Sequence, residues 1–186
     1  MSSDEREHDD DHREGAGEPV PLALTVVVAR LDVTDSADVL RALSGHLLDA
    51  GAVTLDFPEA LQAREQRYPT GLPTPVPTAI PHADPEHVLI PGLALASLAH
   101  PVPFGEMGGT GDTVDARLVA MPLLSNAREH LAALQRLMGL LRDGAAVADL
   151  LEAADEADLR ERAEAQLRRG PAAPGPDADD TEEKRA

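Results

Sequence analysis

The sequence predicts an α/β protein, a single domain with a mixed central β-sheet flanked by helices. Short segments rich in β-branched and aliphatic residues alternate with longer segments whose apolar residues recur at helical spacing. The chain has 186 residues, enough for one domain with a sizeable core. That core must consist mainly of Ala, Val, Leu and Ile, because the chain contains two Phe, one Tyr and no Trp.

The first half of the domain predicts a strand, two helices and a proline-rich loop. Residues 22–31 are rich in valine and leucine and are short, as expected of a strand. A helix follows, with Ser36 as its capping candidate and Gly51 ending it. A second helix covers 57–67. Residues 69–78 contain four prolines, so we expect an extended, tightly held loop there.

The second half predicts two strands followed by helices. The strands are 93–99 and 116–124, and the segment between them, 101–112, is predicted to be a loop. The predicted helices are 126–144, 145–154 and 156–167.

Both ends of the chain are acidic, rich in Gly and Pro, and without periodicity. We expect residues 1–19 and 170–186 to be disordered acidic tails around one domain, residues 20–169. The chain carries a formal net charge of −18, of which the tails account for −6 and −3. The domain therefore carries −9 and is itself acidic.

The charge pattern bears on partners and habitat. Of the 16 basic residues only Lys184 is a lysine, and this pattern resembles acidic proteins of salt-loving organisms. At about 1 M salt the Debye length is about 3 Å, so such a charge need not destabilise the fold. Without a basic stripe to replace counterions, we expect no nucleic-acid partner.

Several site classes and locations are disfavoured by what the sequence lacks. There is no cysteine, which excludes disulfides, thiolate metal sites and a cysteine nucleophile. No apolar run reaches the roughly 18 residues needed to span a bilayer, so we expect no direct membrane insertion. The N-terminal segment also lacks the residue order of a signal peptide, and we expect a cytoplasmic protein.

His82 is the histidine whose setting suggests chemistry. It follows a short β-type stretch and Pro81, which restricts the backbone entering it. An imidazole held at a strand end suits a nucleophile or a phosphoryl carrier. The residues alone leave a purely structural histidine open.

Four motifs in order resemble the active-site region of fructose/mannitol-type enzyme IIA domains of sugar phosphotransferase systems, most of all their galactitol-like branch. They are Ala63-Arg64-Glu65 with Tyr68-Pro69-Thr70-Gly71-Leu72, Ala79-Ile80-Pro81-His82-Ala83-Asp84, Pro101 to Met107, and Asn126 to Leu137. The resemblance covers about residues 22–168. It implies the fold of those IIA domains.

The resemblance also implies a phosphoryl relay. The histidine phosphocarrier protein would donate a phosphoryl group to Nε2 of His82, and a IIB component of a sugar permease would accept it. Arg64 and His130 match the family positions that stabilise the anionic group. No cofactor or metal is implied, because the donor is already a phosphorylated protein.

Other assignments stay open. The same site could serve a regulatory IIA-like domain that signals through the phosphorylation of His82. A metal-binding module or hydrolase could use His82, His87 and His130, although Pro85 interrupts that span and no acidic ligand is obvious. The chain could also be a purely structural acidic protein.

The roles of several neighbours are also open. Asp84 could orient His82 or only cap a turn, and the hydroxyls of Thr70 and Thr74 could donate to the phosphoryl group or only to loop turns. At high salt, docking should depend on apolar contacts more than on charge. The candidates for an apolar docking patch are Leu72, Val76, Phe104 and Met107.

Overall fold

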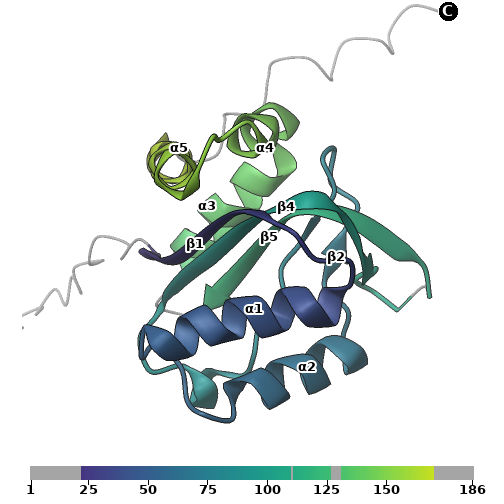
Figure 1. The fold of residues 1–186 in the computed structure, drawn as a ribbon, viewed down its shortest axis with the longest axis vertical. Coiled ribbons are helices and arrows are strands. Elements are labelled where there is room, and N and C mark those ends of the chain that lie inside the picture. The colour runs from purple at the N-terminus through teal and green to yellow at the C-terminus, as the bar shows by residue number, and fades with distance from the viewer. Residues whose placement is uncertain (1–21, 110, 127–130, 170–186) are drawn as a thin grey trace, which may run out of the picture.

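The fold is a mixed β-sheet covered by helices on both faces (Figure 1). The computed structural model describes residues 22–109, 111–126 and 131–169. The predicted tails, 1–19 and 170–186, lie outside the described residues. Within the described part the predicted fold class is confirmed.

The sheet joins strands that are distant in the sequence. The strands are β1 (Leu24–Leu31), β2 (Gly71–Leu72), β3 (Thr78–Ala79), β4 (Gly92–Gly105) and β5 (Thr113–Leu123). Their order in the sheet is β1-β4-β5-β3-β2. The pairs β1–β4 and β3–β5 are parallel, whereas β4–β5 and β2–β3 are antiparallel.

The predicted loop 101–112 is wrong over its first part, because β4 continues to Gly105 and pairs with β5. Val102 and Phe104 are buried and alternate with exposed Pro101 and Pro103, the pattern of a half-buried strand. The two prolines, which favour a loop in a sequence, concealed this alternation.

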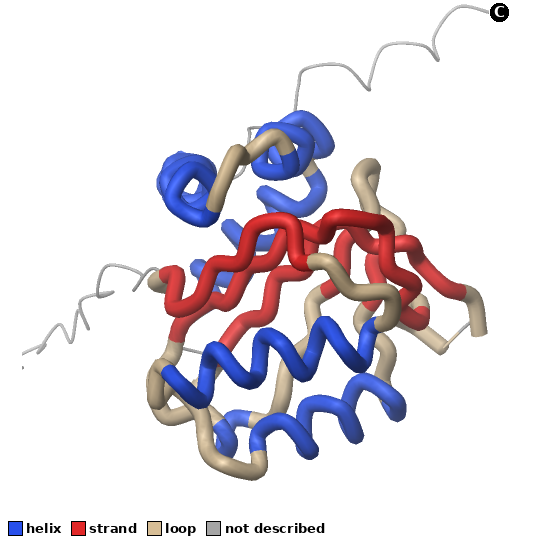
Figure 2. The backbone as a smooth tube through the Cα atoms, in the orientation of Figure 1, coloured by secondary structure: helices blue, strands red, loops and turns tan. Residues whose placement is uncertain are grey.

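The helices α1 (Ser36–Asp49) and α2 (Phe57–Arg67) cover one face of the sheet (Figure 2). The α2 bounds match the prediction. The capping residue of α1 is Asp35 rather than Ser36, since the Asp35 carboxylate accepts a 2.8 Å hydrogen bond from the backbone N–H of Asp38. These helices bury a layer of apolar side chains against the sheet, including Val39, Leu40, Leu43, Leu47, Phe57 and Leu61.

The opposite face is covered by α3 (Leu131–Arg142), α4 (Gly144–Leu151) and α5 (Glu156–Arg169). The helix predicted over 126–144 ends at Arg142. The cause is Asp143, which begins α4 by accepting 3.0 Å hydrogen bonds from two backbone N–H groups in its first turn.

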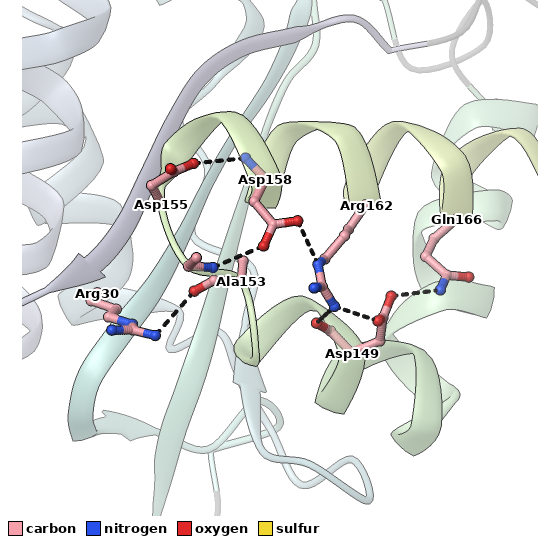
Figure 3. Close-up of polar contacts among 8 residues, drawn as sticks. Arg30, Asp149, Ala153, Asp155, Asp158, Arg162 and Gln166 are labelled. Carbon is pink, nitrogen blue, oxygen red and sulfur yellow. Dashed lines mark hydrogen bonds and ion pairs between the residues drawn. The ribbon is translucent and has the colours of Figure 1, made fainter.

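An ion-pair network joins α4 to α5 (Figure 3). The Arg162 guanidinium lies 2.7 Å from both the Asp149 and the Asp158 carboxylates, and Gln166 donates to Asp149 over 3.2 Å. The turn between the two helices is tied to β1 by Arg30, which donates to the carbonyl of Ala153 over 3.3 Å.

No helix in the described part of the chain is both long and apolar enough to cross a membrane.

Candidate functional site

His82 lies three residues beyond β3, in a segment held by the sheet and by the preceding loop. Thr78 and Ala79 pair with β5, and the Ile80 N–H donates to the carbonyl of Thr70 over 3.2 Å. His82 itself is half-buried. His82 therefore lies just beyond the end of a strand, as predicted, in a segment whose backbone is held by β5 and by Thr70.

Both ring nitrogens of His82 are engaged, and their partners determine the tautomer. Nδ1 lies 2.9 Å from the carbonyl oxygen of Ile80, which can only accept a hydrogen bond. Nε2 lies 3.1 Å from Nη2 of Arg64, which can only donate. The neutral imidazole therefore carries its proton on Nδ1 and a lone pair on Nε2.

The Arg64 guanidinium holds this arrangement from the last turn of α2. Its Nη2 donates to His82, and its Nη1 binds the Asp84 carboxylate at 2.9 Å. The guanidinium carbon lies 5.7 Å from the centroid of the Tyr68 ring. Nε of Arg64 is buried and has no hydrogen-bond partner among the described residues. The side chain is thus aimed at His82 and has donor capacity left.

An open pocket of about 430 Å³ lies beside His82. It is lined by Arg64, Arg67, Tyr68, Pro69, Thr70, His82, Met107, Gly108 and Gly109. The two guanidinium groups make this a cationic spot on an acidic chain, and the pocket is roomy enough for a phosphoryl group.

Beneath the pocket a buried carboxylate binds the loop. Glu65 is 8% exposed, and its two oxygens accept from the N–H of Thr70 at 3.0 Å and from the Thr70 hydroxyl at 2.7 Å. Burial raises the pKa of the Glu65 carboxyl, and the two hydrogen bonds from Thr70 partly oppose this.

The structure answers several questions that the sequence left open. Asp84 makes an ion pair with Arg64, and the same arginine donates to His82. The Thr70 hydroxyl proton is directed to Glu65, and the Thr74 hydroxyl donates to the carbonyl of Val76 over 2.7 Å. Neither hydroxyl is aimed at His82.

The predicted apolar docking patch is only partly present. Met107 is 41% exposed and lines the pocket. Phe104 is 1% exposed and belongs to the core, so its assignment to the patch is wrong. Leu72 and Val76 are half-buried against the core beneath the α3–α5 layer.

His130, the other predicted site histidine, lies outside the described residues. His87 does not join His82. Its Nδ1 lies 3.3 Å from the Asp56 carboxylate and its Nε2 lies 3.7 Å from that of Glu86. Within residues 22–109, 111–126 and 131–169, no group of three or more His, Asp or Glu side chains is placed to hold a metal ion.

No role was predicted from the sequence for Glu65, Arg67 or Tyr68. A signal for Glu65 existed, because it continues the four-residue spacing of Phe57 and Leu61 along the buried face of α2. A glutamate on an apolar helix face is buried only where donors satisfy it.

Solved structures share this fold. One is the IIA mannitol protein of Escherichia coli, at 24% identity and a TM-score of 0.59 over 73% of this chain and 94% of that one. Another is the E. coli complex of enzyme IIA mannitol with phosphorylated enzyme IIB mannitol, at 22% identity and 0.62 over 77% and 97%. A third is the nitrogen regulatory protein IIA-Ntr of Neisseria meningitidis, at 23% and 0.55 over 74% and 92%.

No curated protein matches the chain. A family model does, over residues 22–165, which include His82, Arg64 and all the described elements of the sheet. The chain belongs to the EIIA 2 family of the phosphoenolpyruvate-dependent sugar phosphotransferase system.

Proposed function

We propose that the domain of residues 20–169 is a phosphoryl-carrier IIA component that accepts a phosphoryl group on Nε2 of His82. The observation that carries this proposal is the fixed tautomer. The Ile80 carbonyl binds Nδ1–H at 2.9 Å, which leaves the lone pair on Nε2, next to Arg64, and both side chains line the pocket. A neutral imidazole is a competent nucleophile near pH 7.

The phosphoryl transfer needs no cofactor. The Nε2 lone pair attacks the phosphorus of a donor phosphohistidine, and the donor's P–N bond breaks with its electron pair returning to the donor ring. The proton on Nδ1 of His82 stays in place, held by Ile80. No metal or nucleotide is needed, because the phosphoryl group arrives already activated.

Arg64 supplies the positive charge in this proposal. Its Nη2 lies within hydrogen-bonding distance of Nε2 of His82. A small rotation of the guanidinium would move its N–H groups from the lone pair to the oxygens of a bound phosphoryl group. The unpartnered Nε adds a further donor. We propose His130 as a second stabilising group, on the resemblance of its motif alone.

The partners in this proposal are a histidine phosphocarrier protein as donor and a IIB component as acceptor, in the cytoplasm. Membership of the family supports the role, and the similar fold of a IIA protein solved in complex with a phosphorylated IIB supports the acceptor.

The test is a phosphorylation assay with phosphoenolpyruvate, enzyme I and the phosphocarrier of the same organism. Wild type should gain an acid-labile, base-stable phosphate that is absent from His82→Ala. His87→Ala is the matched control, since it removes a histidine of the same segment whose ring faces Asp56 and Glu86. Absence of label on wild type, with the phosphocarrier itself labelled, would refute the proposal.

A regulatory role is the second candidate, supported by the shared fold of a nitrogen regulatory IIA protein. The two roles differ in the acceptor. Transfer from phosphorylated His82 to a IIB protein supports transport, whereas a phosphorylated chain that discharges to no IIB of its organism supports regulation.

A further inference from the structure

A continuous path of hydrogen bonds runs from Glu65 to His82. The Glu65 oxygens accept from the Thr70 N–H and from the Thr70 hydroxyl. The Thr70 carbonyl accepts from the Ile80 N–H at 3.2 Å, and the Ile80 carbonyl accepts from Nδ1 of His82 at 2.9 Å. Each residue of the path thus holds the next.

The path begins at the carboxylate of Glu65, which is buried. Glu65 lies on the buried face of α2 at 8% exposure, and Thr70 is 3% exposed. A buried carboxylate is tolerated where hydrogen bonds compensate its lost hydration, and here two donors of one residue meet its two oxygens. Such a bidentate contact fixes both the position and the orientation of Thr70.

Thr70 is the residue that holds the Ile80 peptide beyond the end of β3. The carbonyl that selects the His82 tautomer belongs to a segment whose ladder pairing ends at Ala79, since only Thr78 and Ala79 pair with β5 on one side and with β2 on the other. The next backbone contact of that segment is the one from Ile80 to Thr70. If Thr70 shifts, the acceptor at Nδ1 shifts with it.

We propose that Glu65 is a positioning residue, which through Thr70 keeps the Ile80 carbonyl against Nδ1 and so keeps the lone pair of His82 on Nε2. The effect of Glu65 on the rate of phosphorylation rests on the function proposed above, whereas its effect on the tautomer of His82 does not. The hydrogen bonds of Glu65 go to Thr70, so they act on His82 through the loop.

The test compares four variants with wild type. Glu65→Ala removes both hydrogen bonds to Thr70, whereas Glu65→Gln can accept from the N–H and donate to the hydroxyl. Thr70→Val removes only the hydroxyl bond, and it serves if Glu65→Ala does not fold. Leu150→Ala is the control for lost stability, since Leu150 is 0% exposed in the core on the opposite face of the sheet.

The first readout is the tautomer of His82, measured at pH 8 by long-range ¹H–¹⁵N correlation of the imidazoles, with the His82 signals assigned by their loss in His82→Ala. Wild type should show protonated Nδ1. Glu65→Ala should gain a clear share of the Nε2–H form, Thr70→Val a smaller share, and Glu65→Gln and Leu150→Ala none.

The second readout is the rate of phosphorylation of His82. Glu65→Ala should be slower by about 10- to 100-fold, the cost of a misplaced reacting atom, and Glu65→Gln should recover most of the rate. An unchanged tautomer in both Glu65→Ala and Thr70→Val, or an equal change in Leu150→Ala, would overturn the proposal. If wild type is not phosphorylated at all, the proposed function fails, while the tautomer measurement still decides the role of Glu65.

Discussion

Nη2 of Arg64 donates to Nε2 of His82 over 3.1 Å, while Nη1 of the same guanidinium binds the Asp84 carboxylate at 2.9 Å. The planar fork of an arginine can serve both partners at once, because its donors project in fixed directions. The site therefore depends on the shape of this cation as well as on its charge.

Arg64→Lys should slow phosphorylation of His82. A lysine keeps the positive charge but cannot bridge His82 and Asp84 with a planar fork. We expect a rate loss of about 10²-fold, the size found when one preorganised donor to a developing anion is removed. The measurement is the initial rate of phosphohistidine formation.

Two substitutions serve as controls for the arginine. Arg67→Lys changes the neighbouring guanidinium, which lines the pocket and lies 5.5 Å from the centroid of the Tyr68 ring, and it should cost much less. Asp84→Asn should also have a modest effect, since Asp84 is 61% exposed and exposed ion pairs contribute little. Equal losses in all three variants would contradict the special position of Arg64.

Glu65 should make stability depend on pH in a definite direction. Because burial raises its native pKa, the folded protein holds a proton that the unfolded chain has lost at pH values between the unfolded and the native pKa. Wild-type stability relative to Glu65→Gln should therefore fall as pH rises from about 4.5, the ordinary value for a glutamate, through the native pKa. Denaturant unfolding of both proteins at a series of pH values measures this, and parallel curves would show that the native pKa of Glu65 is not raised.

The Asp158–Arg162 pair should make stability change with pH in the opposite direction, so that stability is lost as pH falls. The hydrogen bond from Arg162 lowers the pKa of Asp158, so the folded protein keeps this carboxylate ionised where the unfolded chain is protonated. The stabilisation should be present above about pH 3.8 and be lost as pH falls through the native pKa. Asp158→Asn should lower the thermal midpoint at neutral pH, and the difference from wild type should shrink in acid.

Salt provides a second check on the same pair. Since the pair is partly exposed, 1 M salt should reduce the difference between wild type and Asp158→Asn. A difference that is unaffected by salt would mean that Asp158 acts mainly through its 2.9 Å hydrogen bond from the Ala154 N–H.

Two glycines should respond oppositely to alanine. A Cβ on Gly71 would lie 2.7 Å from the carbonyl oxygen of Gly105. Gly71→Ala must therefore push the β4–β5 hairpin away from β2 and destabilise the fold. Gly45 lies within α1 with no atom within 4 Å of such a Cβ, so Gly45→Ala should stabilise the protein by about 0.5–1 kcal/mol. Denaturant midpoints of the two variants measure both effects, and a loss in Gly45→Ala would contradict the open space at that position.

Helix α2 could be predicted from the sequence to the residue, because Pro58 and the spacing of Phe57 and Leu61 are local signals. The family likewise follows from motifs that can be read in order along the chain, and these single out Arg64 and His82. The roles of His82, Arg64 and His130 stay predictions.

The second part of β4 could not be predicted from the sequence, because its strand conformation depends on pairing with a distant segment of the chain. Residues 101–105 contain two prolines and form a strand because β5 returns beside them, with Val102 opposite Ala116 and Phe104 opposite Val114. The short strands β2 and β3 exist for the same reason, since two residues form a ladder only where a partner is already in place.

The sequence by itself determined the family, the fold class and the acidity of the whole chain, and it predicts which residues carry chemistry. The tertiary structure decided how those residues are held: the tautomer of His82, the fork of Arg64, and the burial of Glu65 against Thr70. The physical reason is that a hydrogen bond depends on distance and direction between groups far apart in the chain, and these are fixed only when the two core layers pack.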